Sequence, residues 1–390
     1  MKSQLFFLYL ASFITLAGFS MVFPLLPFYA QTFGATNAQI GLLAASFSIA
    51  QFISAPIIGR LSDRFGRKPI LAISLAGSAV SFLIFGLSPS LAWLFLARTM
   101  HGIFSAGAFP IAAAYIGDVT SKENRVKYMG RLTATQSLGF IVGPAASGLL
   151  SGVSINLPFF AASAVSLINS LFIIFWLSES LTKKTEKLAI KEGLINLKAV
   201  VNGLRGEFGT LFFLLSGWAF AISNMQVAFP LFAEEKFAFT GVQNGFVFAF
   251  MGTLGAIVQW VLLPKAVKII GEHKTAAIGV FIMAAGQFLI PTAPSVIFLT
   301  AFILTSSLGG SLFRPTINAI LSKEAKEGQG ATMGMAFSFE SLGRVMGPLA
   351  AAILLTTLGI QSQFVLTSSI LIIGVLLFLK ATTKVHKKLA

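Results

Sequence analysis

The chain has 390 residues, of which 56% are hydrophobic and only 11% are charged, and its mean hydropathy is +0.86. A water-soluble domain of this length needs a more polar surface, so the composition excludes one and indicates a membrane protein. The formal net charge of +15 does not indicate nucleic-acid binding, because the basic residues stand in short clusters between long apolar runs. The chain has no cysteine, which excludes disulfides, catalytic thiolates and cysteine-bound metals.

Apolar runs long enough to cross a bilayer occur twelve times along the chain. A helix of roughly 17–25 residues crosses a hydrocarbon core about 30 Å thick. We predict transmembrane helices at 6–28, 38–58, 69–88, 92–117, 130–152, 158–178, 209–232, 242–264, 275–292, 296–320, 331–356 and 362–381. The first run continues past residue 25, which is too long for the apolar core of a signal peptide. The sequence therefore predicts an all-α membrane protein of twelve helices.

The basic residues between the spans predict which side of the membrane each loop faces. If the N-terminus is cytoplasmic, nearly all lysines and arginines outside the spans fall on the cytoplasmic side, and only Lys236 falls on the other. Cytoplasmic loops of membrane proteins carry this excess of positive charge. We therefore expect a multi-pass protein of the plasma (inner) membrane of a microbe, with both termini in the cytoplasm.

The longest polar stretch, at 179–208, divides the spans into six and six. It predicts an N-terminal bundle at 1–178, a cytoplasmic linker at 179–208 and a C-terminal bundle at 209–390. Two interpretations of the linker stay open, a plain tether and an amphipathic helix that rests on anionic lipid.

An internal repeat relates the two halves. In the fifth span Gly130, Gly139, Gly143 and Pro144 stand in a pattern that returns in the eleventh span, each 204 residues later, as Gly334, Gly343, Gly347 and Pro348. Parallel repeats of six spans build two pseudo-symmetric bundles that rock about a central site, which is the architecture of a secondary transporter. A channel or a membrane-bound enzyme does not need this arrangement.

The loop after the second span carries the sequence GRLSDRFGRKP at 59–69. It resembles the loop between the second and third helices of the major facilitator superfamily. The resemblance implies a gating latch in which Asp63 lies against the start of the eleventh helix and Arg64 or Arg67 pairs with Asp118. Gly59 and Gly66 are expected to permit a tight turn. The alternative is a positively charged loop without a gating role.

The fourth span contains Arg98 and His101 in the sequence LFLARTMHGIFSAG. A guanidinium group within the membrane is energetically unfavourable and usually functional. The spacing resembles a fourth-helix motif of the same superfamily, whose arginine is linked to proton transfer, although His101 stands where the family usually has Gln. A histidine titrates near neutral pH and could assist proton movement, and a structural histidine in the bundle is the alternative.

The fifth span resembles the glycine motif of the twelve-helix drug–proton antiporter branch of this superfamily. The matching residues are Gly130, Gly139, Gly143, Pro144 and Gly148, and Ser147 replaces one glycine of the final pair. Glycines allow close helix packing, and a proline bends a helix. Helix packing without any transport role is the alternative interpretation.

Polar side chains within the later spans predict the lining of a substrate cavity. They are Asn224, Gln226, Gln259, Gln287, Ser311, Arg314 and Asn318. Together with the 40 phenylalanines, such a lining suits amphiphilic cations or neutral aromatic compounds, and anionic or zwitterionic substrates stay equally open.

Glu340 is the only acidic residue deep within a predicted span, so we expect it to carry the coupling proton, together with Arg98, His101 and Arg344. Arg344 follows Glu340 by four residues and lies on the same helix face. Two interpretations stay open: a carboxylate that exchanges between an ionised and a protonated state, and a permanent ion pair.

The sequence therefore predicts a secondary active transporter with the major facilitator fold. We expect a monomer that exports amphiphilic small molecules by alternating access, with the proton as coupling ion and no metal, no other cofactor and no nucleic-acid partner. No catalytic constellation is present in the sequence. The alternatives are an uncoupled facilitator or flippase of the same fold, and a membrane sensor or scaffold that transports nothing.

Overall fold

The computed structural model describes residues 2–181, 204, 208–324 and 329–389, so the predicted linker at 179–208 lies almost entirely outside the described residues. All regular secondary structure in this part of the chain is helical. Eleven helical stretches are long and apolar enough to cross a membrane. The twelfth long helix, α7 (Lys122–Ser151), is less apolar because Gly, Ser and Thr make up much of it. The prediction of an all-α membrane protein with twelve spans is confirmed.

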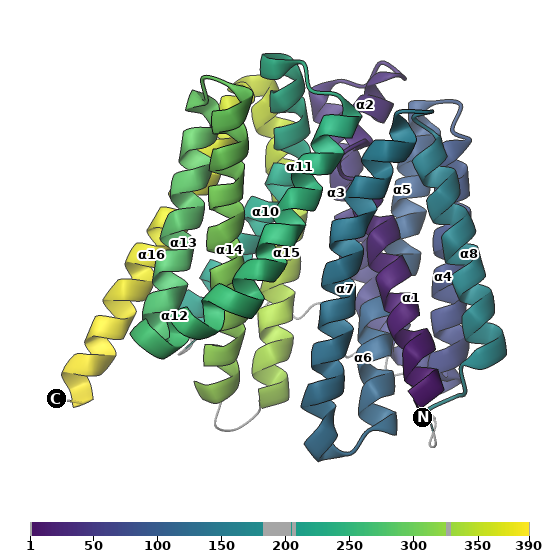
Figure 1. Ribbon diagram of the computed structural model, residues 1–390, viewed down its shortest axis with the longest axis horizontal. Helices are drawn as coiled ribbons and strands as arrows, with labels where there is room; N and C mark the ends of the chain where they lie inside the picture. Colours follow the sequence, from purple (N-terminus) through teal and green to yellow (C-terminus); the bar gives the residue numbers. More distant parts are fainter. Residues whose placement is uncertain (1, 182–203, 205–207, 325–328, 390) are drawn as a thin grey trace. The chain divides into compact units, whose positions relative to one another are not determined.

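The described helices form two compact units. Unit 1 comprises Met1–Ile195 and Phe239–Ala249, and unit 2 comprises Asn196–Ala238 and Phe250–Ala390. The helices of unit 1 run in chain order from purple to teal-blue in Figure 1. They are α1 (Lys2–Met21), α2 (Leu26–Gln31), α3 (Asn37–Phe65), α4 (Arg67–Gly86), α5 (Leu91–Ser105), α6 (Ala108–Val119), α7 and α8 (Leu157–Trp176).

Unit 2 contains the remaining long helices, of which α11 begins in unit 1. They are α10 (Gly209–Phe237), α11 (Gly241–Ile257), α12 (Leu263–Ile270), α13 (Glu272–Leu289), α14 (Val296–Glu324), α15 (Gln329–Thr357) and α16 (Gln361–Leu389). A short 3₁₀ turn, Ile290–Thr292, extends α13.

Besides the ninth, which ends in this 3₁₀ turn, three predicted spans are not continuous α-helices. The first is divided into α1 and α2 near Phe23 and Pro24, and the fourth is divided into α5 and α6 at Ala106 and Gly107. In the eighth span a π-helical turn, Val258–Leu262, joins α11 to α12. Pro264 follows this turn and lacks the N–H group that a regular α-helix would need there, which explains the change in hydrogen bonding.

The helix pairs of one unit recur in the other. In unit 1, α1 packs on α7 and α4 packs on α8, and in unit 2, α10 packs on α15 and α13 packs on α16. These are the first and fifth, third and sixth, seventh and eleventh, and ninth and twelfth spans. The sequence repeat therefore corresponds to the same helix packing in each unit.

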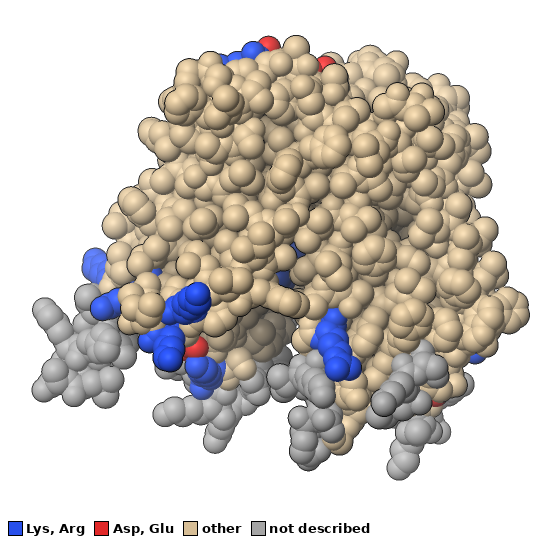
Figure 2. Space-filling view, in the orientation of Figure 1, with Lys and Arg blue, Asp and Glu red and all other residues tan. Residues whose placement is uncertain are grey.

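Charged side chains gather at the helix ends. Over unit 2, most of the lysines and arginines visible in Figure 2 lie at the end of the bundle that holds α12, a few charged groups lie at the opposite end, and the middle of the visible face is largely uncharged. Lys265 and Lys268 are exposed on α12, and Lys323 is exposed at the end of α14. An apolar belt with charged ends is the surface that a bilayer requires.

Candidate functional site

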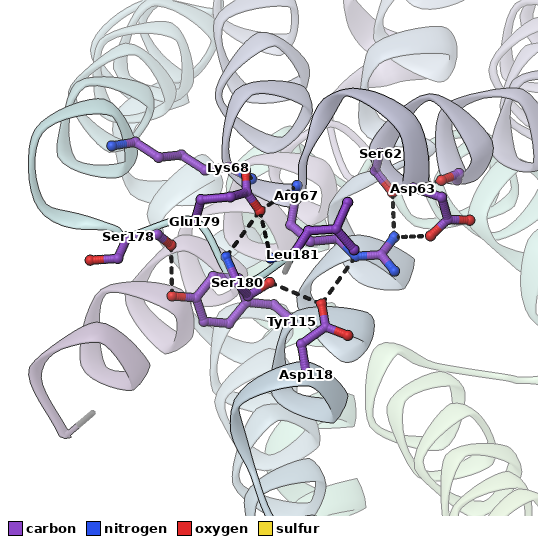
Figure 3. Close-up of polar contacts among 11 residues, drawn as sticks. Ser62, Asp63, Arg67, Lys68, Tyr115, Asp118, Ser178, Glu179, Ser180 and Leu181 are labelled. Carbon is purple, nitrogen blue, oxygen red and sulfur yellow. Dashed lines mark hydrogen bonds and ion pairs between the residues drawn. The ribbon is translucent and has the colours of Figure 1, made fainter. Parts of the chain in front are cut away.

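The loop between α3 and α4 holds a cluster of charged groups in unit 1 (Figure 3). The Arg67 guanidinium group donates from Nη1 to Asp63 Oδ1 at 2.5 Å and to Ser62 Oγ at 2.7 Å. Its Nε donates to Asp118 Oδ2 at 3.3 Å. The structure therefore brings Arg67 to Asp118. Arg64 instead lies over the ring of Phe65, with its guanidinium carbon 5.2 Å from the ring centroid.

Glu179 belongs to the same cluster, although the sequence alone placed it in the linker. Its carboxylate accepts the backbone N–H groups of Arg67 at 2.9 Å and Lys68 at 3.2 Å, which are the first two of α4. These N–H groups have no partner within their helix, and a carboxylate is stabilised at a helix N-terminus. Ser180 adds a hydrogen bond from its Oγ to Asp118 Oδ2 at 2.9 Å. Glu179 thus fixes the end of the sixth span to the start of the third.

Gly66 makes the turn on which this cluster depends. Its φ of +117° is a conformation that residues with a Cβ rarely adopt. A Cβ at this position would also collide with the carboxylate of Glu179. The expectation that Gly59 shares in the turn is wrong, because Gly59 lies inside α3 with open space around it. The predicted contact of Asp63 with the start of α15 joins the two units and stays a prediction.

Arg98 and His101 lie together in the interior of unit 1. Arg98 is only 2% exposed, and its Nε and Nη1 atoms have no hydrogen-bond partner among the described residues. Its guanidinium carbon lies 4.4 Å from the centroid of the Phe47 ring. The His101 ring is buried against Phe82 and Phe47, with centroid distances of 4.3 and 5.1 Å. Arg98 thus faces one aromatic ring, and His101 packs among several.

Gly102 permits this arrangement, because a Cβ there would lie 2.5 Å from the backbone oxygen of Phe47. The close approach of α5 to α3 brings the Phe47 ring over Arg98. The acidic residues of unit 1 whose side chains the structure describes (Asp63, Asp118 and Glu179) lie at or just beyond helix ends. Within these residues Arg98 has an aromatic partner and no carboxylate.

The glycines of α7 face α1. A Cβ on Gly139 would lie 2.5 Å from the backbone oxygen of Phe13, and one on Gly143 would collide with Ala17 and Ser20. Gly148 faces the start of α11, where a Cβ would lie 3.0 Å from the oxygen of Val242.

The other positions of this motif have different surroundings. Gly130 is exposed with nothing within 4 Å of a Cβ, and Pro144 lies inside α7. Ser147, which replaces a glycine of the motif, donates to the backbone oxygen of Met21 at 2.6 Å. It thereby satisfies a carbonyl group at the end of α1 that lacks an intrahelical partner.

Glu340 is held by two arginines in unit 2. Arg314 on α14 donates from Nε to Oε1 and from Nη2 to Oε2, both at 3.1 Å. Arg344 on α15 donates from Nη2 to Oε2 at 3.3 Å. The pairing of Glu340 with Arg344 follows from their spacing in the sequence. The pairing with Arg314 does not, because Arg314 lies on another helix.

The residues predicted to line a cavity divide into two groups. Asn224 is buried and donates from Nδ2 to Thr367 Oγ1 at 2.9 Å, and Gln287 is buried and donates from Nε2 to Ser306 Oγ at 3.1 Å. The structure gives these two residues a role in helix packing instead of the predicted lining role. The others are half-buried and keep partly accessible side chains: Gln226, Gln259, Ser311, Arg314 and Asn318.

Comparison with known proteins places this geometry in context. The chain matches the family model described as Major Facilitator Superfamily over residues 8–269 and 262–390. It is 31% identical over 371 residues to Multidrug resistance protein 2 of Bacillus subtilis (strain 168), with 93% of this chain and 91% of that protein covered. It is 32% identical over 346 residues to the Tetracycline resistance protein, class B, of Escherichia coli, with 86% and 84% covered.

A solved structure shows the same fold. It is that of a bacterial homolog to the human lysosomal transporter Spinster, in an inward-facing and unoccupied conformation. The TM-score is 0.81 at 15% sequence identity, over 97% of this chain and 96% of that chain.

Proposed function

Because this chain belongs to the major facilitator superfamily and is a drug-efflux type of transporter rather than an enzyme, we propose that it couples the export of amphiphilic small molecules to protons. The position and pairing of Glu340 are the observation on which the proposal rests. It is the one described acidic side chain that lies deep within a span, and arginines from two helices hold it.

The proposal places the protein in the plasma membrane of a microbe, as a monomer with both termini in the cytoplasm. The excess of lysine and arginine at the loops between α3 and α4 and near α12 supports this orientation. The resistance proteins to which the chain is similar come from bacteria, which supports the choice of membrane.

The geometry of Glu340 suggests how a proton changes the structure of the bundle. Both carboxylate oxygens accept hydrogen bonds from arginines, so a proton can bind only if at least one of these contacts opens. A neutral Glu340 no longer attracts the two guanidinium groups, which repel each other. Protonation would therefore loosen the connection between α14 and α15 and bias the exchange between conformations.

Substitution of Glu340 by Gln tests this role. The amide keeps a hydrogen-bond acceptor for the arginines but cannot exchange a proton at the working pH. In proteoliposomes the Glu340→Gln protein should exchange substrate down its gradient and lose accumulation driven by a pH gradient. A well-folded Glu340→Gln protein that still accumulates substrate in response to a pH gradient would exclude Glu340 as the proton carrier.

An uncoupled facilitator is the second candidate, and the double pairing of Glu340 favours it. Removing one partner of a buried ion pair costs about 3–5 kcal/mol, so a permanent structural pair predicts that the Glu340→Gln protein is unstable. A thermal unfolding measurement on the purified variant separates this outcome from a loss of coupling in a stable protein.

A further inference from the structure

The membrane-spanning helices of unit 2 carry one positive charge in excess. Apart from Lys380, which lies at the end of the twelfth span, the described ionisable side chains within the predicted spans of this unit are Arg314, Arg344 and Glu340. Two guanidinium groups therefore share one carboxylate. Uncompensated charge within a span is energetically unfavourable, and ionisable residues in such places commonly mark a substrate or ion pathway.

Both arginines keep hydrogen-bond donors that Glu340 does not use. Arg314 uses Nε and Nη2 for Glu340, and Arg344 uses Nη2. Their remaining N–H groups have no acceptor among the described residues. Each arginine side chain is 40% exposed, whereas that of Glu340 is 4% exposed. Glu340 is thus enclosed, and part of each arginine stays accessible.

Trp218 on α10 adds an aromatic face and one more donor to this site. The guanidinium carbon of Arg314 lies 5.1 Å from the centroid of the Trp218 ring. The indole Nε1–H group is buried and has no acceptor among the described residues. Gly310 leaves room for the indole, because a Cβ there would lie 3.2 Å from Nε1. The site therefore combines unused N–H donors with an aromatic surface.

We propose that this arginine pair binds the acidic group of the substrate, so that the exported compounds are aromatic carboxylates rather than organic cations. A carboxylate added to two guanidinium groups and Glu340 gives an electrically neutral set, whereas a cation would increase the excess charge. Guanidinium groups match carboxylates in geometry and in charge. An organic anion also leaves a cell with a negative interior in the direction favoured by the membrane potential. The inference rests on the proposed function, since it names the substrate class of the exporter.

Three probes that share one ring system test this inference: pyrene-1-butyrate, its trimethylammonium analogue and the neutral pyrenebutanol. Binding is measured by fluorescence anisotropy on the full-length protein in phosphatidylcholine nanodiscs, with protein-free nanodiscs subtracted. The carboxylate should bind at least about tenfold more tightly than the other two probes, as expected for charge-assisted hydrogen bonds. Arg314→Gln should remove most of this preference.

Matched variants keep the test specific. Lys265→Gln removes one exposed positive charge from the same unit and should leave all three affinities unchanged. Arg314→Lys keeps the charge but loses the planar donor fork, so it should retain part of the preference. If the Arg314→Gln protein does not fold, the Arg314→Lys protein takes its place in the binding measurement. Equal or tighter binding of the ammonium probe would overturn the inference, as would carboxylate binding that neither Arg314 variant weakens.

Uptake of the same probes into proteoliposomes separates the two proposals. If the ammonium probe is transported and the carboxylate is neither bound nor transported, the proposed export function is supported and the inferred substrate class is rejected. If the carboxylate binds in an Arg314-dependent manner and no probe is transported, the assignment of carboxylate binding to the arginine pair is supported and the proposed export function is rejected.

Discussion

At the scale of single residues, the loop between α3 and α4 depends on contacts between groups far apart in the sequence. Gly66 satisfies two requirements at once, a positive φ and the close approach of the Glu179 carboxylate. Glu179 in turn caps α4 from 112 residues away. Arg67 joins α3 to α6 through Asp63 and Asp118. The resemblance in the sequence indicated most of these residues, but the capping carboxylate is visible only in the structure.

Asp63→Asn should leave folding intact and greatly reduce transport. The Asp63 side chain is 45% exposed, and Arg67 keeps Asp118 and Ser62 as partners, so the loss in stability should stay below about 1 kcal/mol. Glu272→Gln is the matched control, because Glu272 pairs with Lys323 at the corresponding place in unit 2, where the loop lacks an aspartate. Normal transport by Asp63→Asn, measured against membrane expression, would rule out the latch.

Arg98→Leu should abolish transport without destabilising the protein. Two guanidinium nitrogens of Arg98 are buried and lack hydrogen bonds within the described residues, so an apolar side chain removes a desolvation cost. The lost contact with Phe47 offsets only about 0.5–2 kcal/mol of this gain. The thermal unfolding midpoint of the purified variant should therefore be unchanged or higher. A clear fall in the midpoint would assign Arg98 a structural role instead, as would full transport activity in the variant.

At the scale of helices, the glycine motif of α7 is a packing surface for α1. Its counterpart on α15 faces α10 in the same way, since a Cβ on Gly343 would collide with the oxygen of Ser216. The Ser20 hydroxyl lies 3.4 Å from the oxygen of Gly139, and the Ser223 hydroxyl lies at the same distance from the oxygen of Gly343, although each has a shorter acceptor in its own helix. Each unit thus repeats the same close approach between its first and fifth helices.

Two alanine substitutions in α7 should have opposite effects on stability. Gly139→Ala places a methyl group 2.5 Å from the backbone oxygen of Phe13, so it should destabilise unit 1 by about 1–3 kcal/mol. Gly130→Ala meets open space in a helix and should be neutral or stabilising by up to about 1 kcal/mol. Differential scanning fluorimetry on both purified variants measures the difference. Equal unfolding midpoints would show that the α1–α7 contact does not limit stability.

The sequence predicted the number and nature of the helices because apolar length depends only on local composition. It did not predict the breaks in the first and fourth spans or the π-helical turn before α12, which arise from hydrogen bonding around prolines and glycines. Glu340 was identified by exclusion, and its neighbour Arg344 by helical spacing. Arg314 could not be paired with Glu340 in advance, since that contact depends on how α14 packs beside α15.

Asn224 and Gln287 show why polar residues within a span are ambiguous in a sequence. A buried amide either contacts a substrate or forms its hydrogen bonds within the protein, and the amino-acid sequence alone does not distinguish the two cases. In the structure both side chains donate to neighbouring helices, α16 for Asn224 and α14 for Gln287, while the buried Oδ1 of Asn224 has no partner among the described residues. Arg314 and Arg344, by contrast, keep donors free.

At the scale of the whole molecule, the sequence repeat gives two units with similar helix packing. The charged groups that we connect with transport occur in only one unit each. The latch sequence is complete only in the first half, where Asp63 stands at the position of Lys268 in the second. The Glu340 site occurs only in the second half, since Gln136 and Phe140 occupy the corresponding positions of α7. We interpret this division as one unit that controls opening and another that responds to the proton.

Proton movement during transport tests this account most directly. Proteoliposomes containing the wild-type protein and an internal pH-sensitive dye receive the pyrene probe that the protein binds, with protein-free liposomes as control. We expect probe and protons to move in opposite directions, and an imposed pH gradient to drive accumulation of the probe. Protein-dependent movement of the probe down its own gradient, with no change in internal pH and no response to a pH gradient, would contradict the account.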